Sequence, residues 1–482
     1  MELNPTFVIA INIIIIVTIG SRIVSRRAPV SETLYWLAII VLIPVFGGIL
    51  YLVIKEKPIG RKRFKRNNEL IKSRLSEDLH NRSEAQPSIE TLTNDQKSFI
   101  KLLNIENRFE PCTACNLKLL SNENETLELL MKDIQHAQKT INFCTYLWVS
   151  EGKILEIENA LIAASKRGVK INLLLDDLGS TAFFETDRAE RLRKAGINVV
   201  AALKAGIIRG LFRRIDIRNH RKIYTFDNKI AYTGSMNLVD SNSFKPWHNL
   251  GNWIDAVIRF EGPAASKLDK IFCDDFFLET GNHIHRDTYQ LNASLIELDK
   301  PIDVMQLIPA GRNIPRGHMH SIYLMLLYVA KKQITISSPY LIPSDGIVAA
   351  LCTAAKRGIN VRLITTKRSD AKVVQLASEF HYQELHDAGV KIYLYAGALL
   401  HAKTLTVDDD FSMVGSLNLD MRSFYINFEI CPFIYGKRFA AKLLGLQETY
   451  IKSSNLISEN WFTHSKKRRI SQLLARLISP IL

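Results

Sequence analysis

The sequence predicts an α/β fold in which two homologous domains follow an N-terminal pair of membrane helices. Three observations support this prediction. The first 54 residues contain two uncharged apolar runs, the remainder alternates apolar strand-like runs with helix-patterned stretches, and this alternation occurs twice along the chain. The chain has 482 residues, 47 % of them hydrophobic and 23 % charged, which is enough apolar surface to bury more than one core and excludes a disordered protein.

Composition also narrows the classes of function. Lys and Arg number 63 against 48 Asp and Glu, and the net charge of +15 favours anionic partners: nucleic acid, anionic lipid or a phosphate-bearing substrate. Six scattered cysteines are too few for a disulfide scaffold. Cys112 and Cys115 form a C-x-x-C with no second pair nearby, so we expect neither a zinc site nor a metal cofactor.

The two apolar runs, at residues 6–24 and 34–54, predict a membrane hairpin over residues 1–60. A spanning helix needs about 20 apolar residues, so the second run is long enough. The first run reaches this length if the Arg22 side chain extends to the interface. A cleaved secretory signal is a weaker alternative, because no basic residue precedes the first run. A buried helix of a soluble protein is the other alternative.

The basic residues around these runs predict an orientation. Three arginines lie between the runs, whereas seven Lys and Arg lie within residues 55–66. The positive-inside rule therefore predicts a multi-pass protein of the cell membrane, with two spanning segments and the large C-terminal part on the cytoplasmic side. The cluster at 55–66 is also suited to binding anionic headgroups.

Beyond a polar connector at 61–124, the sequence repeats itself. Similar segments recur in the same order, at 163–175 and 353–365, 193–199 and 386–392, and 220–237 and 401–418. A repeat of this length indicates two homologous domains rather than a solenoid. We place these domains at 125–290 and 291–482, the second ending in C-terminal helices.

Two other segments combine apolar and basic residues. The stretch 204–219, which has no equivalent in the second repeat, either dips into anionic lipid or forms an ordinary basic surface loop. The C-terminal stretch begins with the basic sequence SKKRRI and continues with the apolar sequence LLARLISPIL. It either packs against the second domain or contacts the membrane.

A duplicated motif carries the predicted chemistry. Both copies read H-x-K-x4-D-x6-G-S-x-N, with His220, Lys222, Asp227, Ser235 and Asn237 in the first copy and His401, Lys403, Asp408, Ser416 and Asn418 in the second. Two copies with the same spacing far exceed what composition produces by chance. The residues after each His are β-branched and aromatic, which predicts a strand on which His and Lys share one face. We group Asp227 and Asp408, which open the turns that follow, with the catalytic residues.

Two such motifs brought face to face would form one symmetrical pocket suited to a phosphodiester. The ammonium groups of Lys222 and Lys403 would offset its charge, and the Ser and Asn side chains would donate to its oxygens. One neutral imidazole can attack phosphorus to give a phosphohistidine, while the other, protonated, donates to the leaving oxygen. Nearby carboxylates can bias the two imidazoles toward opposite protonation states, and Asp255 and Glu429 are the candidates, although a structural role fits them equally well.

The duplicated motif resembles that of the phospholipase D superfamily. The stretches LIPVFGGILYLVI, SSPYLIP, GSLNLDMRSFYINFE and RLISPIL extend the similarity to bacterial cardiolipin synthases. This resemblance implies two α/β sandwich domains of phospholipase D type in a pseudo-two-fold arrangement. It also implies a phosphatidyltransferase that joins two phosphatidylglycerol molecules into cardiolipin and releases glycerol, through a phosphohistidine.

The resemblance also implies roles for individual residues. It assigns His220 as the nucleophile and His401 as the acid and base. Phosphate binding is assigned to Lys222, Lys403, Asn237 and Asn418. Asp255 and Glu429 match carboxylates that support the histidines. The implied partners are phosphatidylglycerol and anionic membrane lipid, with no cofactor and no nucleic acid.

Three other functions remain open. A phospholipase D hydrolase would result if water resolved the phosphohistidine. A nuclease of the same superfamily fits the charge of +15, although two membrane segments are unusual for a nuclease. A non-catalytic membrane scaffold is disfavoured by the two intact motifs. The sequence does not predict the oligomeric state.

Overall fold

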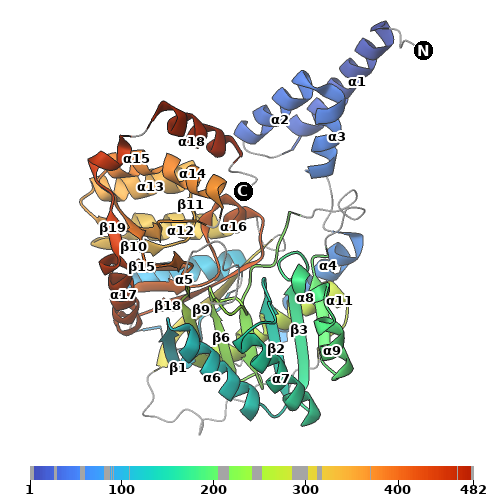
Figure 1. Ribbon diagram of the computed structural model, residues 1–482, viewed down its shortest axis with the longest axis vertical. Helices are drawn as coiled ribbons and strands as arrows, with labels where there is room; N and C mark the ends of the chain where they lie inside the picture. Colours follow the sequence, from blue (N-terminus) through green and yellow to red (C-terminus); the bar gives the residue numbers. More distant parts are fainter. Residues whose placement is uncertain are drawn as a thin grey trace. The chain divides into compact units, whose positions relative to one another are not determined.

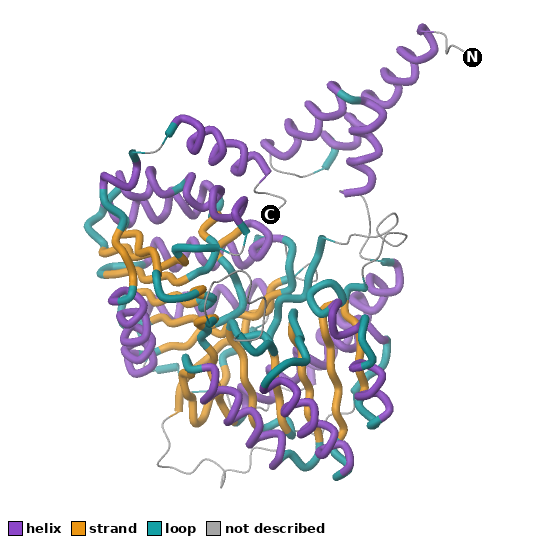
Figure 2. Tube along the Cα trace, in the orientation of Figure 1, coloured by secondary structure: helices purple, strands orange, loops and turns teal. Residues whose placement is uncertain are grey.

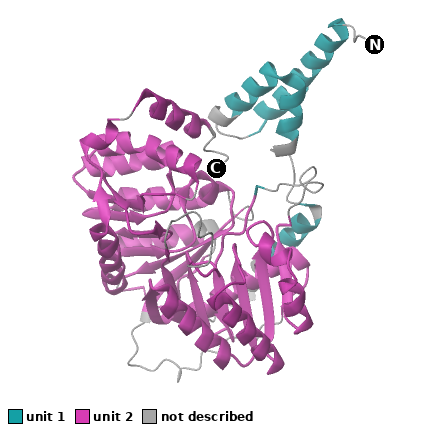
Figure 3. Cartoon of the chain, viewed as in Figure 1, with its two compact units in different colours: residues 1–71, 205–216 teal, residues 72–204, 217–482 magenta. Residues whose placement is uncertain are grey.

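The computed structural model describes residues 5–26, 30–54, 60–80, 87, 89–90, 92–107, 109–204, 216–241, 252–284, 302–311, 317–369, 371–463 and 465–478 (Figure 1). The chain divides into two compact units (Figure 3). The first contains residues 1–71 and 205–216, and the second contains residues 72–204 and 217–482. The helix α4 (Arg61–His80) runs from the first unit into the second.

The first unit contains the apolar helices α1 (Pro5–Val24), α2 (Val30–Leu42) and α3 (Pro44–Ile54). Among the described residues, only α1 is long and apolar enough to cross a membrane. The chain bends back between α2 and α3. The bend is shown by the rings of Trp36 and Tyr51, which pack edge to face with centroids 5.3 Å apart. In one continuous helix these two positions would be about 22 Å apart.

The apolar run at residues 34–54 therefore lies in two helices and not in the single continuous helix that was expected. The 11 residues of α3 extend over only about 16 Å, roughly half of the bilayer core. Pro44 interrupts the helical hydrogen bonds because it has no N–H. Gly47 allows a close approach of the backbone, since a Cβ at this position would lie 2.8 Å from the carbonyl oxygen of Ile39. The sequence argument treated these residues as tolerated within a membrane helix, whereas they reverse the chain.

The second unit is built on one 15-stranded sheet. The first repeat contributes, in sheet order, β1 (Cys112–Leu120), β8 (Val257–Glu261), β6 (Ile230–Gly234), β5 (Ile223–Phe226), β2 (Thr140–Thr145), β3 (Lys170–Asp176) and β4 (Asn198–Ala202). The second contributes β9 (Ile302–Ala310), β18 (Glu429–Tyr435), β16 (Phe411–Val414), β15 (Thr404–Val407), β10 (Gln333–Ser337), β12 (Asn360–Thr366), β13 (Lys391–Tyr395) and β19 (Ser454–Leu456). Apart from β19 the two sets correspond strand for strand, and antiparallel β1 and β9 join them. The predicted pair of homologous α/β domains is confirmed.

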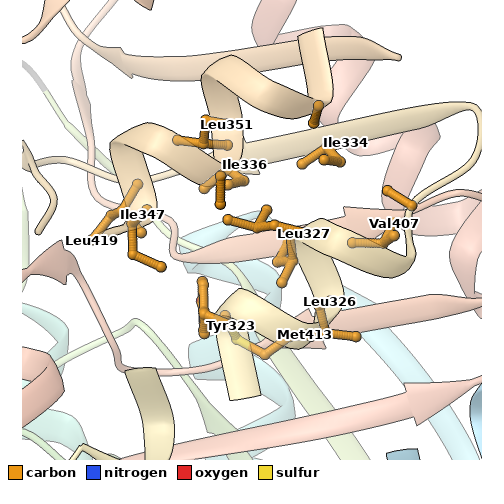
Figure 4. Packing of buried hydrophobic residues seen from close by; sticks show 14 of the residues in the cluster. Tyr323, Leu326, Leu327, Ile334, Ile336, Ile347, Leu351, Val407, Met413 and Leu419 are labelled. Carbon is orange, nitrogen blue, oxygen red and sulfur yellow. The ribbon is translucent and has the colours of Figure 1, made fainter. Parts of the chain in front are cut away.

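Helices cover both faces of this sheet (Figure 2). The face shared by both repeats packs against α11 (Pro263–Thr280) and α17 (Lys437–Lys452). The opposite face packs against α6 (Glu123–His136), α7 (Lys153–Lys166) and α9 (Arg188–Lys194) in the first repeat, and α12 (His318–Val329), α13 (Asp345–Lys356) and α15 (Tyr382–Asp387) in the second. Both faces need cover because successive side chains of a strand point to opposite faces and both sets are apolar. Along β2, Ile141 and Phe143 enter the core on one face, and Cys144 enters the core on the other. Figure 4 shows the core of the second repeat around Leu327 and Ile336.

The remaining elements are short or peripheral. They are the helices α8 (Thr181–Phe184), α14 (Lys372–Phe380), α16 (Met421–Tyr425) and α18 (Lys466–Ile478), the 3-10 turn Glu459–Phe462, and the two-stranded ladders β7 (Trp253–Ile254) with β14 (Leu399–Leu400) and β11 (Leu341–Ile342) with β17 (Leu419–Asp420).

The stretch expected to be a connector, 61–124, is partly built into the second unit. Strand β1 lies at the centre of the sheet, so the first repeat begins before Cys112 and not near residue 125. The helix α5 (Asn94–Asn107) belongs to the core of the second repeat. Its Phe99 ring lies 5.4 Å from the rings of both Phe411 and Phe433. The sequence argument assigned α5 to the connector because most of its residues are polar.

Candidate active site

The two repeats exchange backbone contacts next to the motif histidines. Parallel β7 and β14 pair the first repeat with the second, and Asn219 forms a bridge to Phe428. The N–H of His220 donates to the carbonyl oxygen of Phe428, and the N–H of His401 donates to that of Ile254, both at 2.8 Å. These equivalent contacts hold the two motifs together at the centre of the second unit.

Each histidine is held by a carboxylate of the other repeat. His401 Nδ1 lies 2.7 Å from Asp255 Oδ1, and His220 Nδ1 lies 3.2 Å from Glu429 Oε1. The hydrogen bond between His401 and Asp255 favours the tautomer in which Nδ1 carries the proton, which leaves Nε2 for chemistry. His220 Nδ1 lies near Glu429 Oε1 without a hydrogen bond to it, and it also lies 3.4 Å from the amide nitrogen of Asn427. The sequence predicted both carboxylates as supports for the histidines, but nothing in the spacing indicated that the pairs cross between repeats.

Ser235 and Ser416 contact the two carboxylates. The Ser235 hydroxyl donates to Asp255 Oδ1 and the Ser416 hydroxyl donates to Glu429 Oε2, both at 2.5 Å. Both side chains are fully buried, and both hydroxyls also accept a backbone N–H at 2.9 Å. A hydroxyl has one proton to donate, and here each serine donates it to a carboxylate. In the structure both serines orient the carboxylates beside the histidines, and their assignment to phosphate binding stays a prediction.

The two motif lysines are buried beside the histidines. Lys222 Nζ donates to the carbonyl oxygen of His220 at 2.7 Å, and Lys403 Nζ donates to that of His401 at 2.6 Å. Each ammonium group retains two further protons. Burial lowers the pKa of Lys222, and it lowers the pKa of Lys403 to about 7. The charge of Lys222 contributes to lowering the pKa of Lys403, so the two lysines belong to one electrostatic site.

The protonation of the His401 pair follows from the same surroundings. Burial, and then the charge of Lys403, lower the pKa of His401 to about 4, so this imidazole is neutral at pH 7 in the substrate-free site. Burial alone would raise the pKa of Asp255, but the neighbouring His401 and Lys403 and the hydrogen bond from Ser235 hold it below its usual value. A neutral imidazole therefore donates Nδ1–H to an ionised carboxylate.

The motif asparagines differ between the repeats. Asn237 Oδ1 accepts the backbone N–H of Leu147 at 3.3 Å, which turns the amide nitrogen away from that loop. Asn418 Oδ1 is buried and has no hydrogen-bond partner among the described residues. Both side chains are almost entirely buried. Their assignment to phosphate binding stays a prediction.

Asp227 and Asp408 lie outside this cluster. Each carboxylate accepts three backbone N–H groups at 2.7–2.9 Å, from residues 138–140 for Asp227 and from residues 331–333 for Asp408. Both adopt left-handed backbone angles, with φ of 52° and 51°, which Asp tolerates in turns. The four residues of β5 separate Asp227 from Lys222, and five extended steps of about 3.3 Å make this roughly 16 Å. In the structure these aspartates fasten the turn to the start of a neighbouring strand, and a catalytic role for them stays a prediction.

Comparisons with known proteins agree with this architecture. Residues 130–275 and 323–447 match the family described as "Cardiolipin synthase, PLD-like domain", and residues 8–55 match the phospholipase D-nuclease N-terminal family. Cardiolipin synthase A of Pectobacterium carotovorum subsp. carotovorum (strain PC1) is 36 % identical over 97 % of this chain and 96 % of its own length. The chain belongs to the cardiolipin synthase family of phospholipase D-like proteins.

Other relatives support the same assignment. The cardiolipin synthase A of Yersinia pseudotuberculosis serotype O:1b (strain IP 31758) is also 36 % identical over 97 % of this chain and 96 % of its own length. The crystal structure of phosphatidylserine synthase from Haemophilus influenzae Rd KW20 has a TM-score of 0.59 and 13 % identity, covering 81 % of this chain and all of that chain, and it shows the fold. This member of the cardiolipin synthase family is an enzyme of the phosphatidyltransferase type.

The structure adds residues that the sequence argument missed. The Tyr146 ring lies 4.4 Å from the His220 ring, and the Trp253 ring lies 4.7 Å from the His401 ring. Arg221, between His220 and the motif lysine, is buried and paired with Asp275. Its guanidinium also donates to carbonyl oxygens of the second repeat, at residues 310 and 429. The two motif copies differ at this position, with Arg in the first copy and Ala in the second. This difference was the signal in the sequence that could have pointed to Arg221.

Two further expectations concern the interfacial insertion and the absence of a metal. Residues 205–215, the centre of the expected interfacial insertion, lie outside the described residues. Within the described ranges, no group of three or more His, Cys, Asp or Glu could hold a metal ion.

Proposed function

We propose that this enzyme transfers a phosphatidyl group from one phosphatidylglycerol to another, giving cardiolipin and glycerol. The crossed arrangement of the histidines is the observation that supports this proposal most strongly. It provides two imidazoles, each beside a carboxylate of the other repeat, and two buried lysine side chains, a set suited to a phosphodiester. The names of the relatives point to the same product.

The proposed reaction has two displacements at one phosphorus atom. Nε2 of His220 attacks phosphorus, the bond from phosphorus to the glycerol oxygen breaks, and His401 gives that oxygen a proton. The headgroup hydroxyl of a second phosphatidylglycerol then attacks, its proton passes to His401, and the bond from phosphorus to His220 breaks. His220 suits the nucleophilic role because its side chain is the more exposed of the two, at 21 % against 13 %.

Substrate binding supplies the proton that His401 needs. In the substrate-free site its pKa of about 4 keeps the imidazole neutral. A phosphodiester anion between the lysines would raise this pKa, because a nearby negative charge favours the protonated form. His401 therefore becomes an acid when the phosphodiester is bound.

The purified enzyme should convert phosphatidylglycerol vesicles into cardiolipin and glycerol in equal amounts. The measurement is quantification of lipid products by mass spectrometry together with an enzymatic glycerol assay. His401→Ala protein serves as the matched control. Phosphatidic acid with glycerol, in place of cardiolipin, would mean that water resolves the intermediate and would contradict the proposed transfer.

The value of kcat/KM should fall as the pH rises from about 4, because the free enzyme must take up a proton at His401, and it should fall more steeply above about pH 7. Lys403, whose pKa is lowered to about 7, carries its charge below this pH and loses it above. The loss of attraction for the phosphodiester should lower kcat/KM by up to about tenfold per pH unit, as expected for one titrating group. The value of kcat should hold to higher pH, because the bound anion raises the pKa of Lys403. A kcat/KM that stays constant from about pH 6 to pH 9 would contradict this role.

We also propose that α1 crosses the membrane, whereas α2 and α3 enter it and return to the same side. Both basic stretches, the arginines at 22–27 and the cluster at 55–66, would then lie on the cytoplasmic side with the catalytic repeats. Ser25→Cys and Lys65→Cys should react with a membrane-impermeant maleimide in inside-out vesicles and not in right-side-out vesicles. Labelling of the two positions from opposite sides would show a complete second span instead.

A further inference from the structure

The C-terminal helix α18 turns its apolar side away from the second repeat. Its large apolar residues have the spacing i, i+3, i+4 and i+7, and their exposed fractions run from 47 % to 69 %: Ile470, Leu473, Leu474 and Leu477. The buried residues of the helix are Gln472 and Ala475, at 8 % and 4 % exposure, on the opposite side. A helix of a soluble domain normally buries its apolar stripe, so this orientation is inverted.

Polar contacts hold α18 in this orientation. The Arg468 guanidinium donates to both carboxylate oxygens of Glu379, at 2.8 and 3.2 Å, and the Gln472 amide donates to the same carboxylate at 3.1 Å. Arg476 lies 4.5 Å above the Phe380 ring and 3.7 Å from the Asp345 carboxylate. Since Glu379 and Phe380 end α14, the basic and amide side chains of α18 fix its polar side to that helix.

The remaining basic residues of α18 lie beside the apolar stripe. At about 100° per residue, Arg469 and Lys467 lie near its two edges and Lys466 near its N-terminal end. No acidic residue occurs in the helix, and no salt bridge joins these three side chains to the described residues. An apolar stripe with basic flanks is the pattern of a helix that lies in the interface of an anionic bilayer.

We propose that α18 binds the surface of an anionic membrane, with its four large apolar side chains among the acyl chains and the three basic residues at the headgroups. Charge favours lipid over a second copy of this helix, because two such helices would bring like charges together. This proposal does not depend on the reaction that the site catalyses. It assigns the second repeat a membrane contact of its own, separate in sequence from α1.

Spin labels on the full-length enzyme test this surface directly. Leu474→Cys carries the label in a chain with Cys115→Ser, because the other five cysteines are buried. Leu178→Cys is the matched control, since Leu178 is 54 % exposed in a turn of the first repeat. The protein is placed in detergent or in nanodiscs of phosphatidylglycerol and phosphatidylcholine, and the collisions of each label with oxygen and with a water-soluble nickel complex are compared.

In the anionic nanodiscs, the label at position 474 should gain oxygen collisions and lose nickel collisions, while the label at 178 should not change. Lys466→Gln, Lys467→Gln and Arg469→Gln together should lower the equilibrium constant for insertion of α18 into the bilayer surface by on the order of a hundredfold. A label at 474 that stays as open to nickel as in detergent would overturn the proposal. So would spin–spin broadening that disappears on dilution with unlabelled protein, because a second copy would then cover the stripe.

Discussion

His220→Ala and His401→Ala should each lower the rate of cardiolipin formation by about 10⁴-fold or more, and the double variant should be no slower than either. Without His220 no phosphohistidine forms, and without His401 the leaving oxygen receives no proton. Both imidazoles serve one phosphorus atom, so removing the second adds nothing to the loss. The measurement is the initial rate of cardiolipin formation from radiolabelled phosphatidylglycerol.

His136→Ala is a suitable control for the histidine variants. His136 lies at the exposed end of α6, where its ring contacts the carbonyl oxygen of Lys132, and it is not part of the site. This variant should retain the rate of the unaltered enzyme. Substantial turnover in either His220→Ala or His401→Ala would mean that the two motifs do not share one reaction.

Asp255→Asn and Glu429→Gln should each lower kcat by about 10²- to 10⁴-fold with little change in KM. An amide cannot balance the charge of an imidazolium and can hold the imidazole in the wrong tautomer. Asp255→Asn should act through His401, and Glu429→Gln through His220, although each carboxylate lies in the other repeat. Steady-state kinetics, with circular dichroism to check folding, separate this effect from a loss of structure.

Serine variants test whether each serine acts through the carboxylate that it contacts. Ser235→Ala removes the hydrogen bond to Asp255 and should cost about 10- to 100-fold, the range for partners that orient a functional group. Combined with Asp255→Asn it should add little, because both act on one unit. Combined with Glu429→Gln its effect should multiply in full. If the effect of Ser235→Ala multiplied in full with that of Asp255→Asn and added little to that of Glu429→Gln, Asp255 and Ser235 would serve different histidines.

Much of the second unit could be predicted from the sequence, because its signals are local or repeated. Two motif copies with one spacing predicted two homologous α/β domains and placed His220, Lys222, His401 and Lys403 together. The helix α5 was assigned to a connector because its polar residues dominate its composition, although Phe99 anchors it in a core. Strand β1 was missed because it precedes the region where the two repeats resemble one another.

The contacts within the site that were not predicted have a common physical origin. A spacing such as H-x-K shows which side chains share a strand face, but not which strand of the other repeat lies opposite. Ser235 was expected to face a phosphate, but the pairing of β6 with β8 places it against Asp255, and parallel β7 and β14 bring that carboxylate to His401. Asp227 shares a motif with His220, yet the length of β5 separates them. Likewise the effect of Pro44 depended on Gly47 and on packing against α2.

A structure of the enzyme with vanadate or tungstate tests the central claim most directly, because both ions mimic a phosphoryl group. The shared site predicts one oxyanion within about 3 Å of a nitrogen of both His220 and His401, with donors from Lys222 and Lys403. Two oxyanions, each bound by the residues of one motif alone, would contradict it. So would a pair of imidazoles too far apart to touch the same ion.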